Sequence, residues 1–291
     1  MKIRKAIIPA AGFGTRFLPA TKSLPKEMLA VIDRPIIQYG VEEAVTAGID
    51  KIAVITSRGK SIMEDHFDAS PELEQFLEEK KKADLLQEVR RVSNLADFCF
   101  IRQKKALGLG HAILMGREYI GREPFAVLLP DDIFVCPSRP CIGQLMDTFE
   151  QYQASVIVLG RVDKEGTKKY GIIKPKKISE RVFKVEDMVE KPGPEKAFSD
   201  LGIIGRYVFT PEIFAAIEKT PPDHRGEIQI TDAIKKLTDE QAVYGYLFEG
   251  KRYDAGNKMG QLEAIVEIAL KHPEFGRPMK DLLLRLSREI S

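Results

Sequence analysis

The chain has 291 residues, of which 44% are hydrophobic. This is enough for one large core, or for a core with a small appended subdomain. Charged residues make up 30%, but the net charge is only +2, which excludes a strong basic signal for nucleic acid and an acidic binding tail. No apolar run approaches the roughly 18 residues that span a membrane. The N-terminus predicts a strand and lacks the pattern of a signal peptide.

The first 162 residues alternate apolar, β-branched runs with helical patterns. Continuous apolar strands joined by helices are typical of a parallel sheet that is covered on both faces. The first part of the chain therefore predicts an α/β layer architecture with right-handed crossovers. Strands are expected at 5–10, 51–57, 98–103, 124–132 and 154–162, and helices at 36–48, 110–120 and 142–152.

The segment 59–95 interrupts this alternation. It contains the helix-prone run "PELEQFLEEKKKADLLQEVRR", in which Glu78 stands four residues before Lys82. We favour a solvated helix on an excursion from the sheet. The alternative is a lid or an oligomer contact.

From residue 163 onward the expected strands are shorter, with less helix between them. We see no internal repeat and no domain boundary, so we predict one domain over 1–291 with a C-terminal helical extension. The later elements are strands at 170–174, 182–188 and 201–209, and helices at 211–219, near 229–238, about 257–271 and 278–289.

The cysteines and histidines predict no metal site. The three cysteines are an odd number and lack the two closely spaced pairs of a metal site. They are interpreted as reduced, cytosolic and structural. None of the histidines has zinc-site spacing. These residues are Cys99, Cys136, Cys141, His66, His111, His224 and His272.

The stretch "AAGFGTR" (10–16) follows the first strand and suits an anion. Its small residues let backbone N–H groups approach a ligand, and Arg16 and Lys26 add positive charge that suits a polyphosphate. It is not a dinucleotide fingerprint, because Phe17 occupies the third glycine position. It is not a Walker A loop, because no glycine precedes the lysine of "TKS" (21–23). The alternative is a glycine-rich turn with surface cations.

The string "LLPDD" (128–132) places two carboxylates just after a buried strand, at the end where ligands of α/β proteins gather. Mg²⁺ prefers oxygen ligands and usually takes one or two carboxylates. The alternative is a helix N-cap or a turn.

The pattern "AAGFGTR-x5-K-x2-PKEML" resembles the signature of sugar-nucleotide pyrophosphorylases. Seven later strings, in order, are similar to the bacterial UTP–glucose-1-phosphate uridylyltransferase family: "RQKKALGLGHAI", "LLPDDIF", "KYGIIKP", "VEKP", "GRYVF", "GEIQITDAI" and "YDAGNKMGQLEA". The resemblance implies a Rossmann-like three-layer α/β/α nucleotidyltransferase fold with a mixed, mainly parallel sheet. It also implies Mg²⁺ dependence, a cytoplasmic setting and homo-oligomers, dimers or tetramers.

The implied reaction is attack of glucose 1-phosphate on the α-phosphorus of UTP, which gives UDP-glucose and pyrophosphate. For such a transfer the protein mainly has to align the two substrates and stabilise the charge that develops during the reaction. The nucleophile arrives on the substrate, so no activated Ser, Cys or His is needed. Residues 1–160 would bind the nucleotide, 161–256 the sugar phosphate, and 257–291 would form the C-terminal helices.

The resemblance also assigns residues. Gln103 can both donate and accept at a base edge, Asp132 would neighbour the metal ligand, and the role of His111 is left open. Catalytic residues are Arg16, Lys26, Asp131 and Lys191. Nucleotide-binding residues are Ala10, Ala11, Gly12, Gly14, Thr15, Glu27, Gln103 and Gly108. Metal ligands are Asp131 and Asp254, and sugar-phosphate-binding residues are Gly171, Glu190, Lys191, Arg206 and Glu227.

Other functions stay open at this point. The first is a thymidylyltransferase, or a uridylyltransferase for another sugar 1-phosphate. The second is a non-catalytic sugar-nucleotide-binding regulatory protein, which would not need the metal carboxylate. A dehydrogenase is disfavoured by the missing third glycine.

Overall fold

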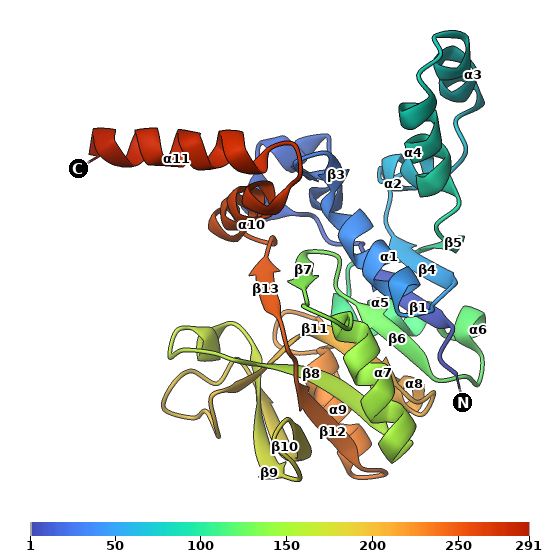
Figure 1. Ribbon diagram of the computed structural model, residues 1–291. Helices are drawn as coiled ribbons and strands as arrows, with labels where there is room; N and C mark the ends of the chain where they lie inside the picture. The colour runs from blue at the N-terminus through green and yellow to red at the C-terminus, as the bar shows by residue number, and fades with distance from the viewer. Residues whose placement is uncertain (1, 291) are drawn as a thin grey trace.

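The computed structural model describes residues 2–290 and contains a nine-stranded sheet with the order β5-β4-β1-β6-β11-β8-β12-β10-β9 (Figure 1). Its strands are β1 (Lys5–Pro9), β4 (Lys51–Thr56), β5 (Asp97–Arg102), β6 (Phe125–Leu128), β8 (Ser155–Arg161), β9 (Gly171–Lys177), β10 (Val182–Glu190), β11 (Leu201–Phe209) and β12 (Val243–Leu247). Two short ribbons pair β2 (Ala30–Val31) with β3 (Arg34–Pro35) and β7 (Asp132–Val135) with β13 (Lys251–Asp254).

Helices cover both faces of the sheet, because successive strand residues point to opposite faces. On β1, Ile7 joins one hydrophobic cluster, whereas Ala6 and Ile8 join the other. Helices α5 (Gly108–Met115), α8 (Ile213–Glu218) and α9 (Ile230–Thr238) contribute to the first cluster, and α1 (Ile36–Thr46), α2 (Ile62–Phe67) and α7 (Cys141–Tyr152) to the second. The three-layer α/β/α fold is therefore confirmed.

The sheet is mixed as expected, but it is not mainly parallel, because among the described strands beyond β6 only β8 and β12 pair in parallel. Strand β1 pairs in parallel with β4 and β6, β4 with β5, and β8 with β12. The pairings of β11 with β6, β8 and β9, and of β10 with β9 and β12, are antiparallel. No helix separates β9 from β10, and antiparallel neighbours need no crossover helix.

The strand expected at 124–132 is interrupted. Strand β6 ends at Leu128, and β7 begins at Asp132 in a separate ribbon. Pro130 has no backbone N–H to continue the ladder, so the chain leaves the sheet there. The helix expected at 110–120 is likewise divided into α5 and α6 (Arg117–Ile120), with Gly116 between them.

Helices α3 (Pro71–Glu79) and α4 (Ala83–Ser93) project from the sheet as an arm (Figure 1). Each buries only one residue, Leu77 and Leu86, so most of the arm is solvated. The excursion from the sheet is as the sequence predicted. Whether the arm also acts as a lid or as an oligomer contact stays a prediction.

The chain ends in α10 (Lys258–Lys271) and α11 (Gly276–Ile290), and α11 extends away from the sheet (Figure 1). Within residues 2–290, no helix combines the length and the apolar character that a membrane span requires.

Candidate active site

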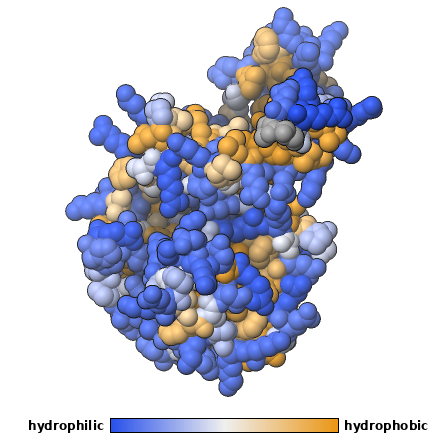
Figure 2. Space-filling model, turned by 90° about the vertical axis from the view of Figure 1, so that its left-hand side faces the viewer, coloured by the Kyte–Doolittle hydropathy of each residue, from blue (hydrophilic) through white to orange (hydrophobic). Residues whose placement is uncertain are grey.

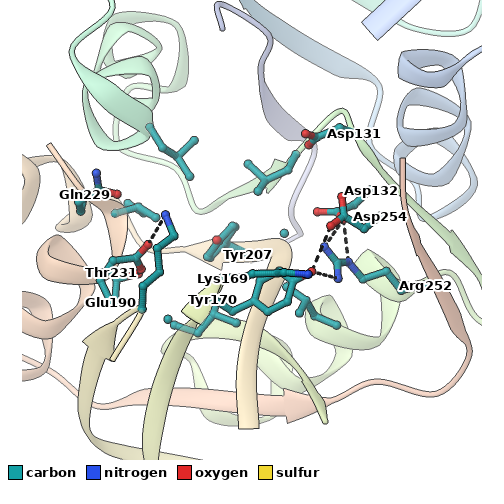
Figure 3. A pocket seen from close by; sticks show the side chains of 18 of the residues that line it. Asp131, Asp132, Lys169, Tyr170, Glu190, Tyr207, Gln229, Thr231, Arg252 and Asp254 are labelled. Carbon is teal, nitrogen blue, oxygen red and sulfur yellow. Dashed lines mark hydrogen bonds and ion pairs between the residues drawn. The ribbon is translucent and has the colours of Figure 1, made fainter. Parts of the chain in front are cut away.

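Most of the predicted site residues line two pockets that meet at one wall. The first pocket, of about 450 Å³, lies over the end of β1; the second, of about 270 Å³, lies between β9, β10 and α9. Volumes of this size are at the lower end of the range of small-molecule sites. Figure 3 shows Asp131 at the edge of the second pocket, with Glu190 and Thr231 across from it. Both pockets share the residues Leu109, Leu129, Asp131 and Glu227.

The small-residue loop forms one wall of the first pocket. Ala10 closes the strand end by donating its N–H to the Ile55 carbonyl at 2.8 Å. Gly14 has a φ of +66°, and a Cβ there would lie 3.2 Å from Lys26 Cβ, so the turn favours glycine. At Gly12 a Cβ would meet no protein atom within 4 Å, which leaves that space to a ligand. Thr15 begins the short 3-10 helix that follows.

Lys26 and Asp131 form an ion pair, with Nζ and Oδ2 2.5 Å apart. Burial alone would lower the pKa of Lys26, but the carboxylates of Asp131 and Glu27 together outweigh burial and the pKa is raised. Conversely, Lys26 holds the pKa of Asp131 below its ordinary value against the effect of burial. Both side chains are therefore charged and fixed. Arg16 reaches the same region, where its Nη1 donates to the Gly256 carbonyl at 3.4 Å.

Glu27 is only 1% exposed and lines the first pocket. Its Oε2 accepts from Lys60 Nζ at 2.9 Å, and the same ammonium donates to the Ala10 carbonyl at 2.5 Å. Its Oε1 is buried without a hydrogen-bond partner among the described residues. An unpaired buried acceptor is costly, so this oxygen is suited to a donor on a ligand. Sequence reasoning missed Lys60, which no motif distinguishes.

Gln103 and His111 lie together at the far side of the first pocket. The Gln103 Nε2 donates to the Gly108 carbonyl at 3.2 Å and contacts His111 Nδ1 at 2.9 Å. Burial lowers the pKa of His111, which favours a neutral ring that accepts at Nδ1. His111 lines neither pocket, and thus orients Gln103. A Cβ at Gly108 (φ +91°) would lie 2.9 Å from Ile228 backbone atoms.

Asp131 and Asp254 converge over Gly256. A Cβ at Gly256 would lie 2.5 Å from Asp131 Oδ2 and 3.1 Å from Asp254 Oδ1, so only glycine leaves room between the two carboxylates. Asp131 and Asp254 also line the second pocket, and two carboxylates beside a pocket match the ligand set of Mg²⁺, which takes its other ligands from phosphates and water. No group of three or more His, Cys, Asp or Glu residues that could hold a metal occurs within residues 2–290.

Asp132 differs from its neighbour. Its carboxylate is buried and pairs with Arg252, and burial raises its pKa to about 7. Its Oδ2 also lies where a Cβ at Gly205 (φ +81°) would be, so glycine is required there. Asp132 therefore supports the loop that presents Asp131.

The second pocket contains most of the residues expected for the sugar phosphate. Glu190 Oε2 accepts from Thr231 Oγ1 at 2.6 Å, while its Oε1 lies 3.1 Å from Lys191 Nζ. A Cβ at Gly171 would lie 2.8 Å from Thr231 Oγ1, which explains the glycine. Glu227 lies in a loop, where its backbone N–H donates to the carboxylate of Asp223 at 3.0 Å.

The prediction that Arg206 binds the sugar phosphate is wrong. Arg206 is 0% exposed and lines neither pocket. Its guanidinium pairs with Glu43 at 2.8 Å and donates to the carbonyls of Leu129, Gly205 and Asp132. These donors are used inside the fold, where they hold the "LLPDD" loop. Every residue of β11, the strand that contains Arg206, is buried. The largely apolar sequence of this strand was the signal that Arg206 is an interior residue.

Sequence reasoning also missed several polar residues of the second pocket, among them Arg252, Tyr170 and Thr231. Arg252 and Tyr170 were inside or beside strings already singled out, but nothing in one sequence shows which way they face. Thr231 followed "GEIQ" and had no separate signal. All three line the pocket.

The chain is similar to known proteins in sequence and in fold. The family model described as nucleotidyl transferase matches residues 5–272. A UTP–glucose-1-phosphate uridylyltransferase of Bacillus subtilis is 54% identical over 94% of this chain and 94% of its own length. A UDP-glucose pyrophosphorylase solved with UDP-glucose is 43% identical, with a TM-score of 0.85 over 93% of this chain and all of its own. The UTP-bound enzyme of Acinetobacter baumannii is 40% identical, with a TM-score of 0.91 over 98% of this chain and all of its own. The chain therefore belongs to the nucleotidyl transferase family, among the bacterial UTP–glucose-1-phosphate uridylyltransferases.

Proposed function

We propose that this protein transfers a uridylyl group from UTP to glucose 1-phosphate, giving UDP-glucose and pyrophosphate. The observation that carries the proposal is the shared wall of the two pockets: Asp131 lines both, so two substrates would meet beside the same carboxylate. Neither pocket is lined by a described serine, cysteine or histidine, which suits a nucleophile that arrives on the substrate.

Residues 1–160 bind the nucleotide. The base lies between Ala11, Gln103 and Gly108, with the unpartnered Glu27 oxygen as an acceptor. The triphosphate follows the loop 10–15, with Arg16 and Lys26 as its cations. These cations stabilise the charge that develops on pyrophosphate as the bond to the α-phosphorus breaks.

Enzymes of this family generally use a divalent metal, and we propose Mg²⁺ here. Asp131 and Asp254 would hold it, because their oxygens converge on the space over Gly256. When bound, the ion supplies charge neutralisation at the phosphates. Lys26 keeps Asp131 ionised, and so in the state that a metal requires.

Residues 161–256 bind glucose 1-phosphate. The carboxylate of Glu190 accepts from adjacent sugar hydroxyls, and the ammonium of Lys191 pairs with the sugar's phosphate. Gly171 lets the backbone approach the sugar closely, since no side chain fits between it and Thr231. Glu227, in the shared wall, faces both substrates. The proximity of the two phosphates then favours in-line attack.

The protein also assembles into homo-oligomers in the cytoplasm, as the family resemblance implies. Support comes from large hydrophobic side chains exposed on α10 and α11, and Figure 2 shows hydrophobic residues in a band across the upper part of the face on which the C-terminal end lies. Such a patch marks an interaction surface. The exposed residues include Met259, Leu262, Leu270, Phe275, Leu282, Leu284 and Leu286. Light scattering on the intact chain should give the mass of a dimer or tetramer, and a monomer at micromolar concentration would contradict this.

One experiment tests the reaction. Pyrophosphate release is measured with a panel of UTP, dTTP, CTP and ATP against glucose 1-phosphate and other sugar 1-phosphates, with Mg²⁺. We expect the fastest release with UTP and glucose 1-phosphate. Faster release with dTTP would favour a thymidylyltransferase, and faster release with another sugar would change the acceptor. No release with any pair would favour a non-catalytic sugar-nucleotide-binding protein.

A further inference from the structure

Two acidic side chains oppose each other on the ribbon that carries the candidate metal site. In the antiparallel pairing of β7 with β13, Asp254 lies directly opposite Asp132. Like charges in this position repel each other. Arg252 stands two residues before Asp254, hence on the same face of β13. Its Nε and Nη2 approach Asp132 Oδ1 at 2.7 and 2.5 Å, which offsets the repulsion.

The same guanidinium reaches the sugar side of the cleft. Its Nη1 donates to the Tyr170 hydroxyl at 2.9 Å, and the guanidinium lies over the tyrosine ring, 5.0 Å from its centre. Tyr170 Oη in turn donates to Asp254 Oδ2 at 3.2 Å. Figure 3 shows these side chains as one connected group. Tyr170 directly precedes Gly171, where β9 and the sugar pocket begin.

Asp254 is thereby fixed at both oxygens. Oδ2 is held by Tyr170, and Oδ1 accepts the N–H of Gly256 at 3.1 Å, which turns Oδ1 toward the space that Asp131 also faces. Groups that orient a metal-binding carboxylate contribute about 10–100-fold to metal affinity or activity. An arginine that only balanced the charge of Asp132 would need no bond to a tyrosine.

We propose that Arg252 is a positioning residue which, through the hydroxyl of Tyr170, holds Asp254 in place for a divalent cation and ties that carboxylate to the loop of the sugar pocket. The inference rests on the proposed function, since it takes Asp131 and Asp254 as metal ligands. Neither Arg252 nor Tyr170 contacts the reacting phosphates in this account; both act through Asp254.

The test compares Tyr170→Phe and Arg252→Lys with the control Lys251→Met. Lys251 neighbours Arg252 on β13, but it pairs with Glu263 and Glu267 of α10 instead of facing the cleft. Binding of Mn²⁺ in the presence of UTP is measured by electron paramagnetic resonance, which needs no turnover. We expect Mn²⁺ affinity to fall about 10–100-fold in both cleft variants. The Mg²⁺ concentration for half-maximal pyrophosphate release should rise in parallel, with little change in the control.

Tyr170→Phe removes a single hydroxyl, so it decides the question even if Arg252→Lys fails to fold. Mn²⁺ affinity equal to that of the wild type in folded Tyr170→Phe would overturn the inference, and so would a wild type that binds no Mn²⁺ with UTP. A wild type that binds Mn²⁺ but releases no pyrophosphate from any substrate pair would instead refute the proposed function. The Mn²⁺ affinities would then still decide the positioning role.

Discussion

Two lysines face the cleft from opposite halves of the molecule, and they are held differently. Lys26 is 21% exposed at its side chain and pairs with Asp131, a residue 105 positions away. Lys191 is 42% exposed, pairs with its own neighbour Glu190, and has a backbone φ of +47°. The nucleotide side is therefore preorganised by a long-range ion pair, whereas the sugar side presents a cation with more freedom to exchange its partner for a phosphate.

Lys26→Ala tests the preorganised side and should have the largest effect. A fixed cation aimed at developing charge contributes about 10²–10³-fold to kcat, so we expect a fall of this size with a smaller change in the KM for UTP. Steady-state kinetics check this, with thermal unfolding as the control for folding. A near-normal kcat would exclude Lys26 as a catalytic cation.

Asp131→Ala removes the partner of Lys26 and one candidate metal ligand together. We expect activity in Mg²⁺ to fall by about 10²-fold, since remaining ligands bind the ion weakly. Increasing Mg²⁺ should recover part of the lost rate. Full activity of Asp131→Ala at ordinary Mg²⁺ concentration would remove the metal assignment.

Lys191→Ala tests the more exposed of the two lysines, on the sugar side of the cleft. Because its ammonium is half-exposed and pairs only with the neighbouring Glu190 among the described residues, we expect the KM for glucose 1-phosphate to rise about tenfold or more, the equivalent of one charge-assisted hydrogen bond. The KM for UTP should change little. The same loss of kcat as in Lys26→Ala, with an unchanged KM, would show that the two lysines do not differ in role.

Glu27→Gln tests the buried acceptor of the nucleotide pocket. The amide introduces donors where the structure has an unpartnered oxygen and a lysine, so we expect about tenfold weaker UTP binding. Isothermal titration with UTP measures this, and Glu42→Gln on α1, outside both pockets, is the matched control. Equal UTP affinity in wild type and Glu27→Gln would exclude a ligand contact at this oxygen.

Asp223→Asn should have the smallest effect. Its carboxylate accepts from the N–H groups of Glu227 and Arg225, and these bonds hold its pKa below the ordinary 3.8. A lowered folded pKa contributes stability above the unfolded value, and that contribution is lost as the pH falls. We expect the wild-type unfolding temperature to begin to drop below roughly pH 5 and to continue dropping below about pH 3, and less so in Asp223→Asn. Parallel curves for the two proteins would argue against this role.

The difference between the halves also explains what the sequence could predict. Strands β1 and β4 are continuous apolar runs, and the loop 10–16 has a local pattern, so the nucleotide side was accessible from the chain alone. The second half depends on long-range pairing: β11 enters between β6 and β8, and β13 pairs with β7, which no local period reveals.

The sequence also could not predict the direction in which a side chain points. Arg206 and Arg252 are both arginines in strands within or beside family-like strings, yet one is buried against Glu43 and the other faces the cleft. A single sequence gives their residue type but not the packing that selects the face. The same limit concealed Lys60, whose partner Glu27 lies 33 residues earlier.

We expect the cleft to bring two substrates into direct reaction without a covalent enzyme intermediate. The decisive measurement incubates the protein with Mg²⁺ and UTP labelled at the α-phosphorus, first alone and then with glucose 1-phosphate. We expect no labelled protein and no stoichiometric pyrophosphate until glucose 1-phosphate is added, followed by labelled UDP-glucose. Label bound covalently to the protein, with one equivalent of pyrophosphate released before the sugar phosphate arrives, would contradict it.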